Sequence, residues 1–400
     1  MTDLILTLNG GSSSLKFAAY DADTTLRVMR GEFANLGQEN ASFRTEVGDL
    51  PQRIDPLGSL DHRAATRHLL TWLAGGAASI RAIGHRLVHG GPDQHAPALI
   101  DPPLLARLQA LREWAPAHLP AELSIIDICR EHFPDLPQVA CFDTAFHRTM
   151  PAVARRIPIP RRLALKGIER FGFHGLSYAY LVDELARQAG PEAAAGRLVL
   201  AHLGSGSSLA AVKARQSIDT TMGFSTAGGI PMATRSGDLD PGLMRHLAQT
   251  EGMDAQAFNS MVNTASGLLG MSEISGDVRE LLRHEASDPR ATEALDTYGY
   301  RIRQAIGALA AALGGIDTLV FTGGVGQNAP AIRSRACGGL EFLGITLDPA
   351  ANAIGGPIIS TRGSSVTVRV IETDEEAVIV SIVQQMLAGG VTSQETAPHD

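Results

Sequence analysis

Two apolar segments that each run into a loop of glycine and serine place the strongest constraint on the fold. The first is residues 4–8, followed by NGGSSSLKF at residues 9–17, and the second is residues 198–203, followed by GSGSSLAAV at residues 204–212. An apolar strand, a glycine turn and a second apolar run predict a β-hairpin, and its N–H groups can cradle an anion. Each loop alone is equally compatible with an ordinary surface hairpin. Their repetition predicts a duplicated domain with a phosphate chain held between the halves.

Length and charge narrow the class of protein. A chain of 400 residues favours two domains. Apolar residues make up 44% and charged residues 19%, which is typical of a soluble enzyme. The formal net charge of −8 argues against a nucleic-acid partner, so an anionic substrate would need local arginine or lysine.

The cysteines and the apolar runs indicate the compartment. Cys129, Cys141 and Cys337 form no close pair, which predicts neither a zinc site nor a disulfide framework. The first residues do not look like a signal peptide, and no apolar run is long enough to span a bilayer. We therefore expect a cytoplasmic protein with no membrane partner.

Short apolar strands alternate with helical patterns along the chain, which predicts an α/β fold. A Pro- and Arg-rich stretch after residue 150 suggests a domain break, and Thr373-Asp374-Glu375-Glu376 is a capping-type start for a helix over residues 377–387. We expect an N-terminal domain of residues 1–147 plus 377–390, a C-terminal nucleotide-binding and dimerisation domain of residues 148–376, and a flexible tail of residues 391–400. The expected strands are 4–8, 14–20, 82–88, 139–142, 197–203, 208–213, 318–322 and 366–371; the other expected helices are 61–73, 104–114, 122–132, 176–188, 241–249, 277–284 and 290–313.

Five short segments carry more polar residues than strands or helices need. They are GHRLVHGG at 84–91, FDTAFH at 142–147, FGFHG at 171–175, TRSGD at 234–238 and FTGGVGQN at 321–328. Together with residues 9–17 they resemble the acetate kinase family, in order from residue 3 to about residue 387. The resemblance implies two duplicated actin-like (ribonuclease H-like) α/β domains with a nucleotide cleft between them, and a homodimer joined through the second domain.

The resemblance also implies the activity. It is the reversible, direct in-line transfer of a phosphoryl group from ATP to acetate, giving acetyl phosphate and ADP, with Mg²⁺ required and Mn²⁺ as a possible substitute. A propionate kinase or a broad short-chain acyl kinase is the alternative, and a pyrophosphate-using relative fits less well. A nucleotide-switched scaffold of the actin or chaperone type would not need arginines directed at an acyl group.

The residues with catalytic chemistry are few. Arg86 and Arg235 follow small or polar runs, and a guanidinium fork suits carboxylate and phosphate oxygens. Asp143 ends an apolar run and could act at a Mg²⁺ site or as a base, or simply cap the following turn. The resemblance makes Arg235 and His174 stabilisers of the transition state, and Asn9 and Glu375 the metal-site residues, with Glu376 as the alternative to Glu375. His89, His147 and His202 are expected to be structural hydrogen-bond partners.

Nucleotide binding is expected from the two glycine loops and from a helix start. The GGVG segment after the expected strand at 318–322 predicts a bend that forms a flat floor for adenosine. Asp277 and Arg279 could contact the base and ribose or form a mere surface pair. The expected nucleotide-site positions are Ser14, Lys16, His202, Leu203, Gly204, Ser205, Gly206, Asp277, Val278, Arg279, Gly323, Gly324, Val325, Gly326 and Asn328.

The acyl substrate is expected to contact Arg86, Val88, Ala117, His118, Phe173 and Thr226. The chain departs from the family pattern near these positions: Ala117 replaces a larger leucine, Thr226 replaces proline and Leu119 follows His118 in place of asparagine. Ser205 and Gln327 replace asparagine and glutamate near the phosphates. Because a smaller wall leaves space for another methylene, we expect propionate to be used nearly as well as acetate.

Overall fold

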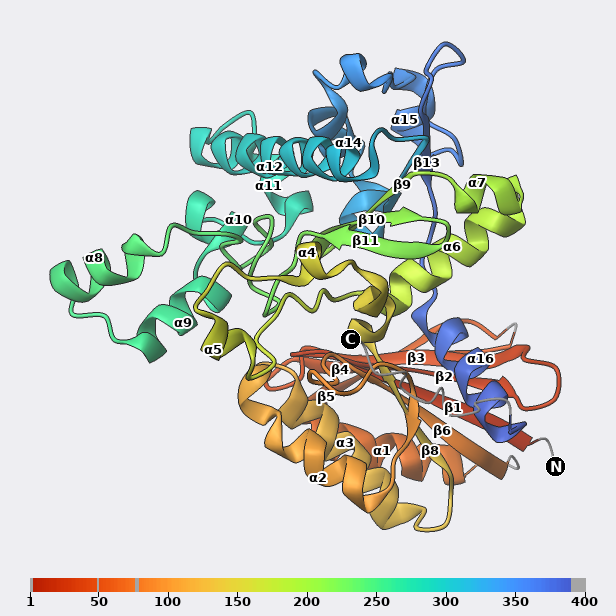
Figure 1. The fold of residues 1–400 in the computed structure, drawn as a ribbon. Helices are drawn as coiled ribbons and strands as arrows, with labels where there is room; N and C mark the ends of the chain where they lie inside the picture. The colour runs from red at the N-terminus through yellow and green to blue at the C-terminus, as the bar shows by residue number, and fades with distance from the viewer. Residues whose placement is uncertain (1–2, 49, 76–78, 390–400) are drawn as a thin grey trace. The chain divides into compact units, whose positions relative to one another are not determined.

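The computed structural model describes residues 3–48, 50–75 and 79–389. Packing divides the chain into two compact units, Met1–Ala145 with Asp374–Asp400 (unit 1) and Phe146–Thr373 (unit 2) (Figure 1). The predicted domain boundaries after residues 147 and 376 lie close to these divisions. The predicted flexible tail at 391–400 lies outside the described residues.

Unit 1 is built on a mixed sheet in the order β5-β4-β3-β2-β1-β6-β8-β7. The predicted first hairpin is confirmed, because β1 pairs antiparallel with β2 and parallel with β6. The strands are β1 (Asp3–Gly10), β2 (Leu15–Asp21), β3 (Arg27–Ala34), β4 (Ala41–Val47), β5 (Arg53–Gly58), β6 (Ser79–Leu87), β7 (Ala98–Leu99) and β8 (Gln138–Phe142).

Helices cover both faces of this sheet. On one face, α1 (His62–Ala74) and α3 (Leu119–His132) enclose a core that includes Ile83. The adjacent Gly84 faces α16 (Glu375–Leu387) instead, because successive strand residues point to opposite faces. Asp61 and Asp101 cap α1 and α2 (Pro102–Ala110), and a 3₁₀ turn, η1 (Arg112–Trp114), follows α2.

Unit 2 repeats the pattern with the sheet order β11-β10-β9-β12-β13. Its hairpin β9–β10 corresponds to β1–β2, and the parallel partner β12 corresponds to β6. The predicted duplication of the α/β fold is therefore confirmed in the strand order. The strands are β9 (Leu198–Leu203), β10 (Ser207–Lys213), β11 (Gln216–Thr220), β12 (Thr318–Thr322) and β13 (Thr367–Val370).

The two faces of the second sheet pack against different helices. Leu198 and Leu200 face the core that contains α6 (Gly175–Ala189), whereas Val199 and Ala201 face the core that contains α12 (Pro289–Leu313). The remaining helices are η2 (Asp143–Thr149), α4 (Ala152–Arg155), α5 (Arg161–Ala164), α7 (Pro191–Ala195), α8 (Gly242–Thr250), α9 (Ala255–Thr264), α10 (Gly267–Ser272), α11 (Val278–His284), α13 (Gly323–Asn328), α14 (Pro330–Cys337), η3 (Glu341–Leu343) and α15 (Pro349–Ile354). Within the described ranges, no helix is both long and apolar enough to cross a membrane.

Two local predictions are wrong. The GGVG segment is not a bend, because residues 323–328 form the short helix α13. Helix α16 begins at Glu375 rather than at residue 377, with Asp374 accepting a hydrogen bond from the N–H of Ala377. Strand ends and glycine loops nevertheless hold most of the predicted site residues.

Candidate active site

Arg86 and Asp143, both predicted site residues, form a partly buried ion pair in unit 1. Arg86 lies near the end of β6, and Asp143 directly follows the neighbouring parallel strand β8, so both side chains reach the same sheet edge. Nη2 of Arg86 lies 2.6 Å from Oδ2 of Asp143, and its Nη1 donates to the carbonyl of Gly10 at 3.1 Å. Asp143 is fully buried and is also the first residue of η2.

Asn9 lies at the same edge, at the end of β1, and contacts two glutamates of α16. Its Nδ2 donates to Oε2 of Glu375 at 2.8 Å and to Oε1 of Glu376 at 3.2 Å. Glu375 Oε2 also lies 4.0 Å from Nε of Arg86. The structure thus brings Asn9, Glu375 and the alternative Glu376 together. Burial, and then the charge of Glu375, raise the pKa of Glu376.

Glu122 is a member of this site that the sequence did not reveal. It is buried on α3, accepts a hydrogen bond from the N–H of Val88 at 3.0 Å, and lies 3.6 Å from Nη1 of Arg86. Burial raises the pKa of Glu122 to about 8, although Arg86 and the Val88 N–H favour its charged form. Burial likewise opposes the charge of Arg86, yet Asp143, Glu375 and Glu122 outweigh it and raise the pKa of the guanidinium.

The oxygens gathered here fit a magnesium ion that also binds substrate phosphates. Carboxylate and amide oxygens are hard ligands, and protein-bound Mg²⁺ commonly uses one or two carboxylates together with phosphates and water. In the part of the chain that the structure describes, no group of three or more His, Cys, Asp or Glu side chains could hold a metal ion alone. Asn9 and Glu375 could therefore supply only some of the ligands of the ion, and phosphate oxygens and water would supply the rest.

In unit 2, Arg235 and His174 converge on Gly206, in the loop between β9 and β10. A methyl group at Gly206 would lie 3.4 Å from Nε2 of His174 and 3.5 Å from Nη1 of Arg235. Arg235 Nη1 donates to the carbonyl of Thr226 at 3.2 Å, so the predicted acyl residue Thr226 contacts the predicted catalytic arginine. Any side chain at position 206 would occupy the space that the two cationic or donor groups face.

The other predicted acyl residues are divided between the units. Val88 and His118 are buried in unit 1, where His118 precedes α3, whereas Ala117 is exposed. Phe173 is buried in unit 2. The exposure of Ala117 means that replacing a larger residue there leaves no hole in the core of unit 1.

The histidines predicted to be structural do make structural hydrogen bonds. His147 is fully buried between Ser217 Oγ at 2.8 Å and the carbonyl of Phe173 at 2.9 Å. His202 bonds Ser177 Oγ, and His89 accepts from the N–H of Gly91. A histidine in an apolar setting with two fixed partners is typical of such a structural role.

Some of the predicted nucleotide residues of unit 2 lie close together, at the end of β9 and the start of α13. Gly323 has φ +76°, and a Cβ there would lie 2.5 Å from the carbonyl of Leu203, so only glycine lets α13 start beside the end of β9. Gly204 closes its turn by donating to the carbonyl of Gly206 at 3.0 Å. Asn328 bonds back to the carbonyl of Gly324 at 3.0 Å.

Asp277 and Arg279 form the surface pair that was the alternative to nucleotide contact. Asp277 caps α11, and its carboxylate lies 2.6 Å from Nη2 of the exposed Arg279. That arrangement leaves the guanidinium accessible to a ligand. In unit 1, Ser14 directly precedes β2 and is half-buried, and Lys16, on β2, is exposed.

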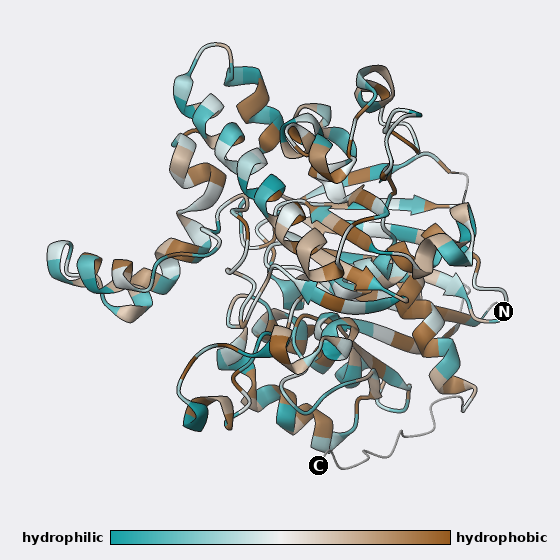
Figure 2. Cartoon of the chain, turned by 45° about the horizontal axis from the view of Figure 1, so that its top comes forward, coloured by the Kyte–Doolittle hydropathy of each residue, from teal (hydrophilic) through white to brown (hydrophobic). Residues whose placement is uncertain are grey.

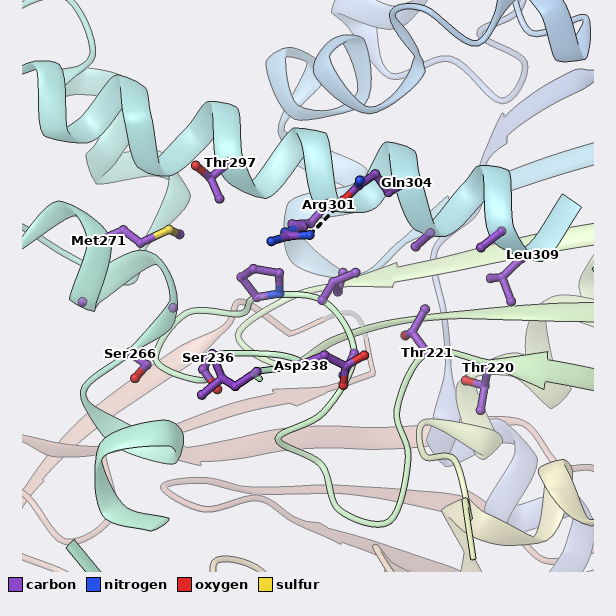
Figure 3. Close-up of a pocket in the computed structure, with 18 of the residues that line it drawn as sticks. Thr220, Thr221, Ser236, Asp238, Ser266, Met271, Thr297, Arg301, Gln304 and Leu309 are labelled. Atoms are coloured by element: carbon purple, nitrogen blue, oxygen red, sulfur yellow. Dashed lines mark hydrogen bonds between the residues drawn. The ribbon is translucent and has the colours of Figure 1, made fainter. Parts of the chain in front are cut away.

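A cavity of about 690 Å³ lies in unit 2 (Figure 3). Helix α12 forms one wall with Thr297, Arg301 and Gln304, and the opposite wall includes Ser236 and Asp238. Its polar groups bond within the protein: Arg301 to Gln304, and Asp238 to the N–H of Gly229. None of the predicted site residues lines it.

Comparison with known proteins identifies the family. The model of the acetokinase family matches residues 4–381. The acetate kinase of Rhodopseudomonas palustris (strain ATCC BAA-98 / CGA009) is 43% identical and covers 98% of this chain and 100% of that protein.

Two solved structures have the same fold over nearly the whole chain. A propionate kinase from Francisella tularensis subsp. tularensis SCHU S4 superposes with a TM-score of 0.89 at 34% identity, over 95% of this chain and 98% of that one. Porphyromonas gingivalis acetate kinase gives a TM-score of 0.86 at 35% identity, over 96% and 100%. The resemblance seen in the motifs is confirmed, and the chain belongs to the acetokinase family.

Proposed function

We propose that the chain catalyses reversible phosphoryl transfer from ATP to acetate. An oxygen of the carboxylate attacks the γ-phosphorus, the bond from that phosphorus to the β,γ-bridging oxygen breaks, and ADP leaves with the electron pair. The convergence of Arg235 and His174 on the bare backbone of Gly206 is the observation that supports this reaction best. Two donors fixed around one small volume suit the equatorial oxygens of a transferring phosphoryl group.

The residues of the two units have complementary roles in this proposal. Arg86, held by Asp143 and by the carbonyl of Gly10, orients the acceptor carboxylate. Arg235 and His174 stabilise the charge that develops on the phosphoryl oxygens. Fixing the acceptor in line lets it attack directly, so no covalent enzyme intermediate is required.

Asn9 and Glu375 would hold a magnesium ion, with Asp143 nearby. When bound, Mg²⁺ neutralises phosphate charge and polarises the phosphoryl oxygens, and Mn²⁺ has compatible ligand preferences. The protein contributes the orientation of the oxygens, because the contacts of Asn9 with α16 fix its amide beside both glutamates.

The test is formation of an acyl phosphate, trapped with hydroxylamine, in reactions with acetate, propionate, butyrate or no acid. We expect product with acetate only when ATP and Mg²⁺ are both present. Arg235→Ala should lower kcat on the order of a hundredfold while the protein stays folded, the loss typical of one transition-state donor. Hydrolysis of ATP without acyl phosphate would instead support a nucleotide-switched scaffold.

Propionate kinase activity remains the second candidate, and the chain's own residue at position 117 favours it. The side chain of Ala117 is small, and it is exposed rather than packed in the core, so it leaves space beside it. An added methylene is worth about 1 kcal/mol in an apolar pocket, less than a factor of ten, so we expect kcat/KM for propionate within about tenfold of that for acetate. Ala117→Leu should restore acetate preference, and strong rejection of propionate by the wild type would contradict the prediction.

The active form is proposed to be a homodimer joined through unit 2, located in the cytoplasm, where ATP is available. Helices α8 and α9 project from the rest of unit 2 (green in Figure 1), and neither buries a residue. Both are amphipathic, with apolar residues such as Leu247 and Met261 among polar ones (Figure 2). Short helices gain most of their stability by packing an apolar face, which supports a second copy as the partner.

A further inference from the structure

The surroundings of His174 in unit 2 fix both its backbone conformation and the direction of its ring. Its backbone is left-handed, with φ 58° and ψ 26°, at the residue preceding α6. Residues other than glycine seldom adopt this conformation, because it brings Cβ close to the backbone. The ring is therefore aimed by the surrounding structure rather than by local preference.

A hydrogen-bonded chain reaches the ring from the side opposite to Gly206. Nδ1 of His174 lies 2.9 Å from Oγ of Ser208 on β10, and the same Oγ bonds the hydroxyl of Tyr178 on α6. Ser208 and Tyr178 are both completely buried, so water does not compete for these groups. Nε2, at the other end of the ring, faces Gly206.

The ring plane is held as well. His202 on β9 stacks on His174 with ring centroids 4.3 Å apart and an angle of 17° between the planes. Ser177, adjacent to Tyr178 on α6, bonds Nδ1 of His202 at 2.8 Å. Two adjacent residues of α6 thus each support one of the stacked rings: Ser177 bonds His202 directly, and Tyr178 reaches His174 through Ser208.

We propose that Ser208 and Tyr178 are positioning residues that keep neutral His174 in the tautomer with its proton on Nε2. Phosphoryl oxygens accept hydrogen bonds and donate none at neutral pH, so Nε2 must carry the proton to interact with them. Nδ1 of the neutral ring is then an acceptor, and Ser208 donates to it. Tyr178 in turn donates to Ser208, which completes a chain of one polarity.

The proposal rests on the assigned contact between His174 and the phosphoryl group, but its direct test does not. The test is ¹⁵N NMR of histidine-labelled protein at pH 8.5, where an ordinary imidazole is neutral. The His174 signals are identified by their loss in His174→Asn, since asparagine tolerates the left-handed backbone. We expect the wild type to show a protonated Nε2 and an unprotonated Nδ1. A proton on Nδ1 in the wild type would overturn the proposal without any variant.

Three variants provide the comparison. Ser208→Ala and Tyr178→Phe should lose the single-tautomer signature of His174. They should also lower kcat about tenfold, because that is the change in rate expected when one neutral hydrogen bond is lost. The KM for acetate should be unchanged. Ser177→Ala is the matched control, because it removes the equivalent bond to His202 and should leave the His174 tautomer intact.

The two readouts separate the possible failures. An unchanged tautomer in folded Ser208→Ala would overturn the positioning role. A tautomer that shifts in Ser208→Ala while acyl phosphate formation keeps its wild-type rate would support the chain of hydrogen bonds and refute the contact of His174 with the phosphoryl group.

Discussion

At the scale of single residues, the site in unit 1 places three carboxylate side chains around the guanidinium of Arg86. Arg86 contacts Asp143 closely and lies within 4.0 Å of carboxylate oxygens of Glu122 and Glu375. An acceptor carboxylate must therefore compete with resident carboxylates for the guanidinium. The charge state of Glu122 should set how strong that competition is.

The first prediction concerns Glu122. Because burial raises its pKa to about 8, the wild-type side chain is mostly neutral at pH 6.5 and ionised at pH 9. We expect the KM for acetate of the wild type to rise severalfold, up to about tenfold, across that range, since each factor of ten corresponds to only about 1.4 kcal/mol. Glu122→Gln keeps an acceptor for the Val88 N–H and lacks the charge.

Steady-state kinetics at the two pH values provide the measurement. In Glu122→Gln the KM should stay near the wild-type value of pH 6.5 throughout. Glu122→Ala serves as the comparison, because it also removes the acceptor for Val88 and should lower stability. An equal rise of KM in the wild type and Glu122→Gln would show that another group titrates.

The second prediction concerns stability and His147. Burial lowers the pKa of His147 to about 4, whereas a histidine in an unfolded chain titrates near 6.5. Between these values the unfolded state binds the proton and the folded state does not, so stability falls as the pH drops from 6.5 towards 4. The full loss is on the order of 3 kcal/mol.

Thermal unfolding at pH 7.5 and pH 5.0 tests this. The transition of unit 2 should move to lower temperature at pH 5.0 in the wild type, and it should move less in His147→Gln. Identical shifts in both proteins would assign the acid sensitivity to other groups, such as the buried His85 of unit 1, whose pKa is likewise lowered to about 4 by burial.

The residues that could be predicted from the sequence are those at strand ends. Asp143 ends an apolar run and Arg86 follows a small, polar one, and the neighbouring parallel strands β8 and β6 then bring the two side chains together. Glu122 could not be predicted, because it lies inside a helix among leucines and isoleucines that form the core. Its role depends on the contact of α3 with β6, which no local pattern encodes.

At the scale of elements, the packing of α16 on the first sheet positions the metal-site glutamate. A Cβ at Gly84 on β6 would lie 2.3 Å from Cγ2 of Ile379 and 2.8 Å from Cγ2 of Val383. Glycine therefore allows the helix to approach the strand closely. Glu375 lies in the first turn of the same helix, so its distance from Asn9 depends on that approach.

The third prediction follows from this contact. Gly84→Ala should displace α16, lower stability by about 1–3 kcal/mol, and reduce kcat and the affinity for Mg²⁺ together. Adding Ile379→Ala should recover part of both losses. Gly75→Ala is the matched control, because Gly75 has φ −72° and its added methyl group would meet nothing nearer than 3.5 Å. Normal kinetics in Gly84→Ala would show that α16 tolerates the added group.

Elements with a clear pattern could be predicted, and the others could not. The hairpins β1–β2 and β9–β10 follow from their glycine turns and apolar runs. Strands β3 to β5 were missed because polar and apolar residues are mixed along them and most of their side chains are partly or fully exposed. Helix α13 was missed because three of its six residues are glycine, which has a low helix propensity.

At the scale of the whole molecule, the proposed assembly depends on α8 and α9. The fourth prediction is that the wild type has about twice the mass of one 42.2-kDa chain in light scattering. Met244→Glu, on the partly exposed apolar side of α8, should shift the mass towards one chain. Gln249→Glu adds the same charge at an exposed polar position of α8 and should leave the mass unchanged.

A wild type that already has the mass of one chain would refute the homodimer. A dimer that persists in folded Met244→Glu would place the interface elsewhere on the protein. The two outcomes are distinct, because the first concerns the existence of the assembly and the second concerns its surface.

The discontinuity of unit 1 has a consequence for biosynthesis. The strands of its sheet are translated first, whereas α16, which covers β1 and β6, follows only after the 228 residues of unit 2, Phe146–Thr373. At about 5–20 residues per second the ribosome needs roughly 10–45 s for that stretch. During this interval the face of the sheet that α16 covers is open to chaperones or to aggregation. The half of the protein that is made second can therefore finish folding before the half that is made first.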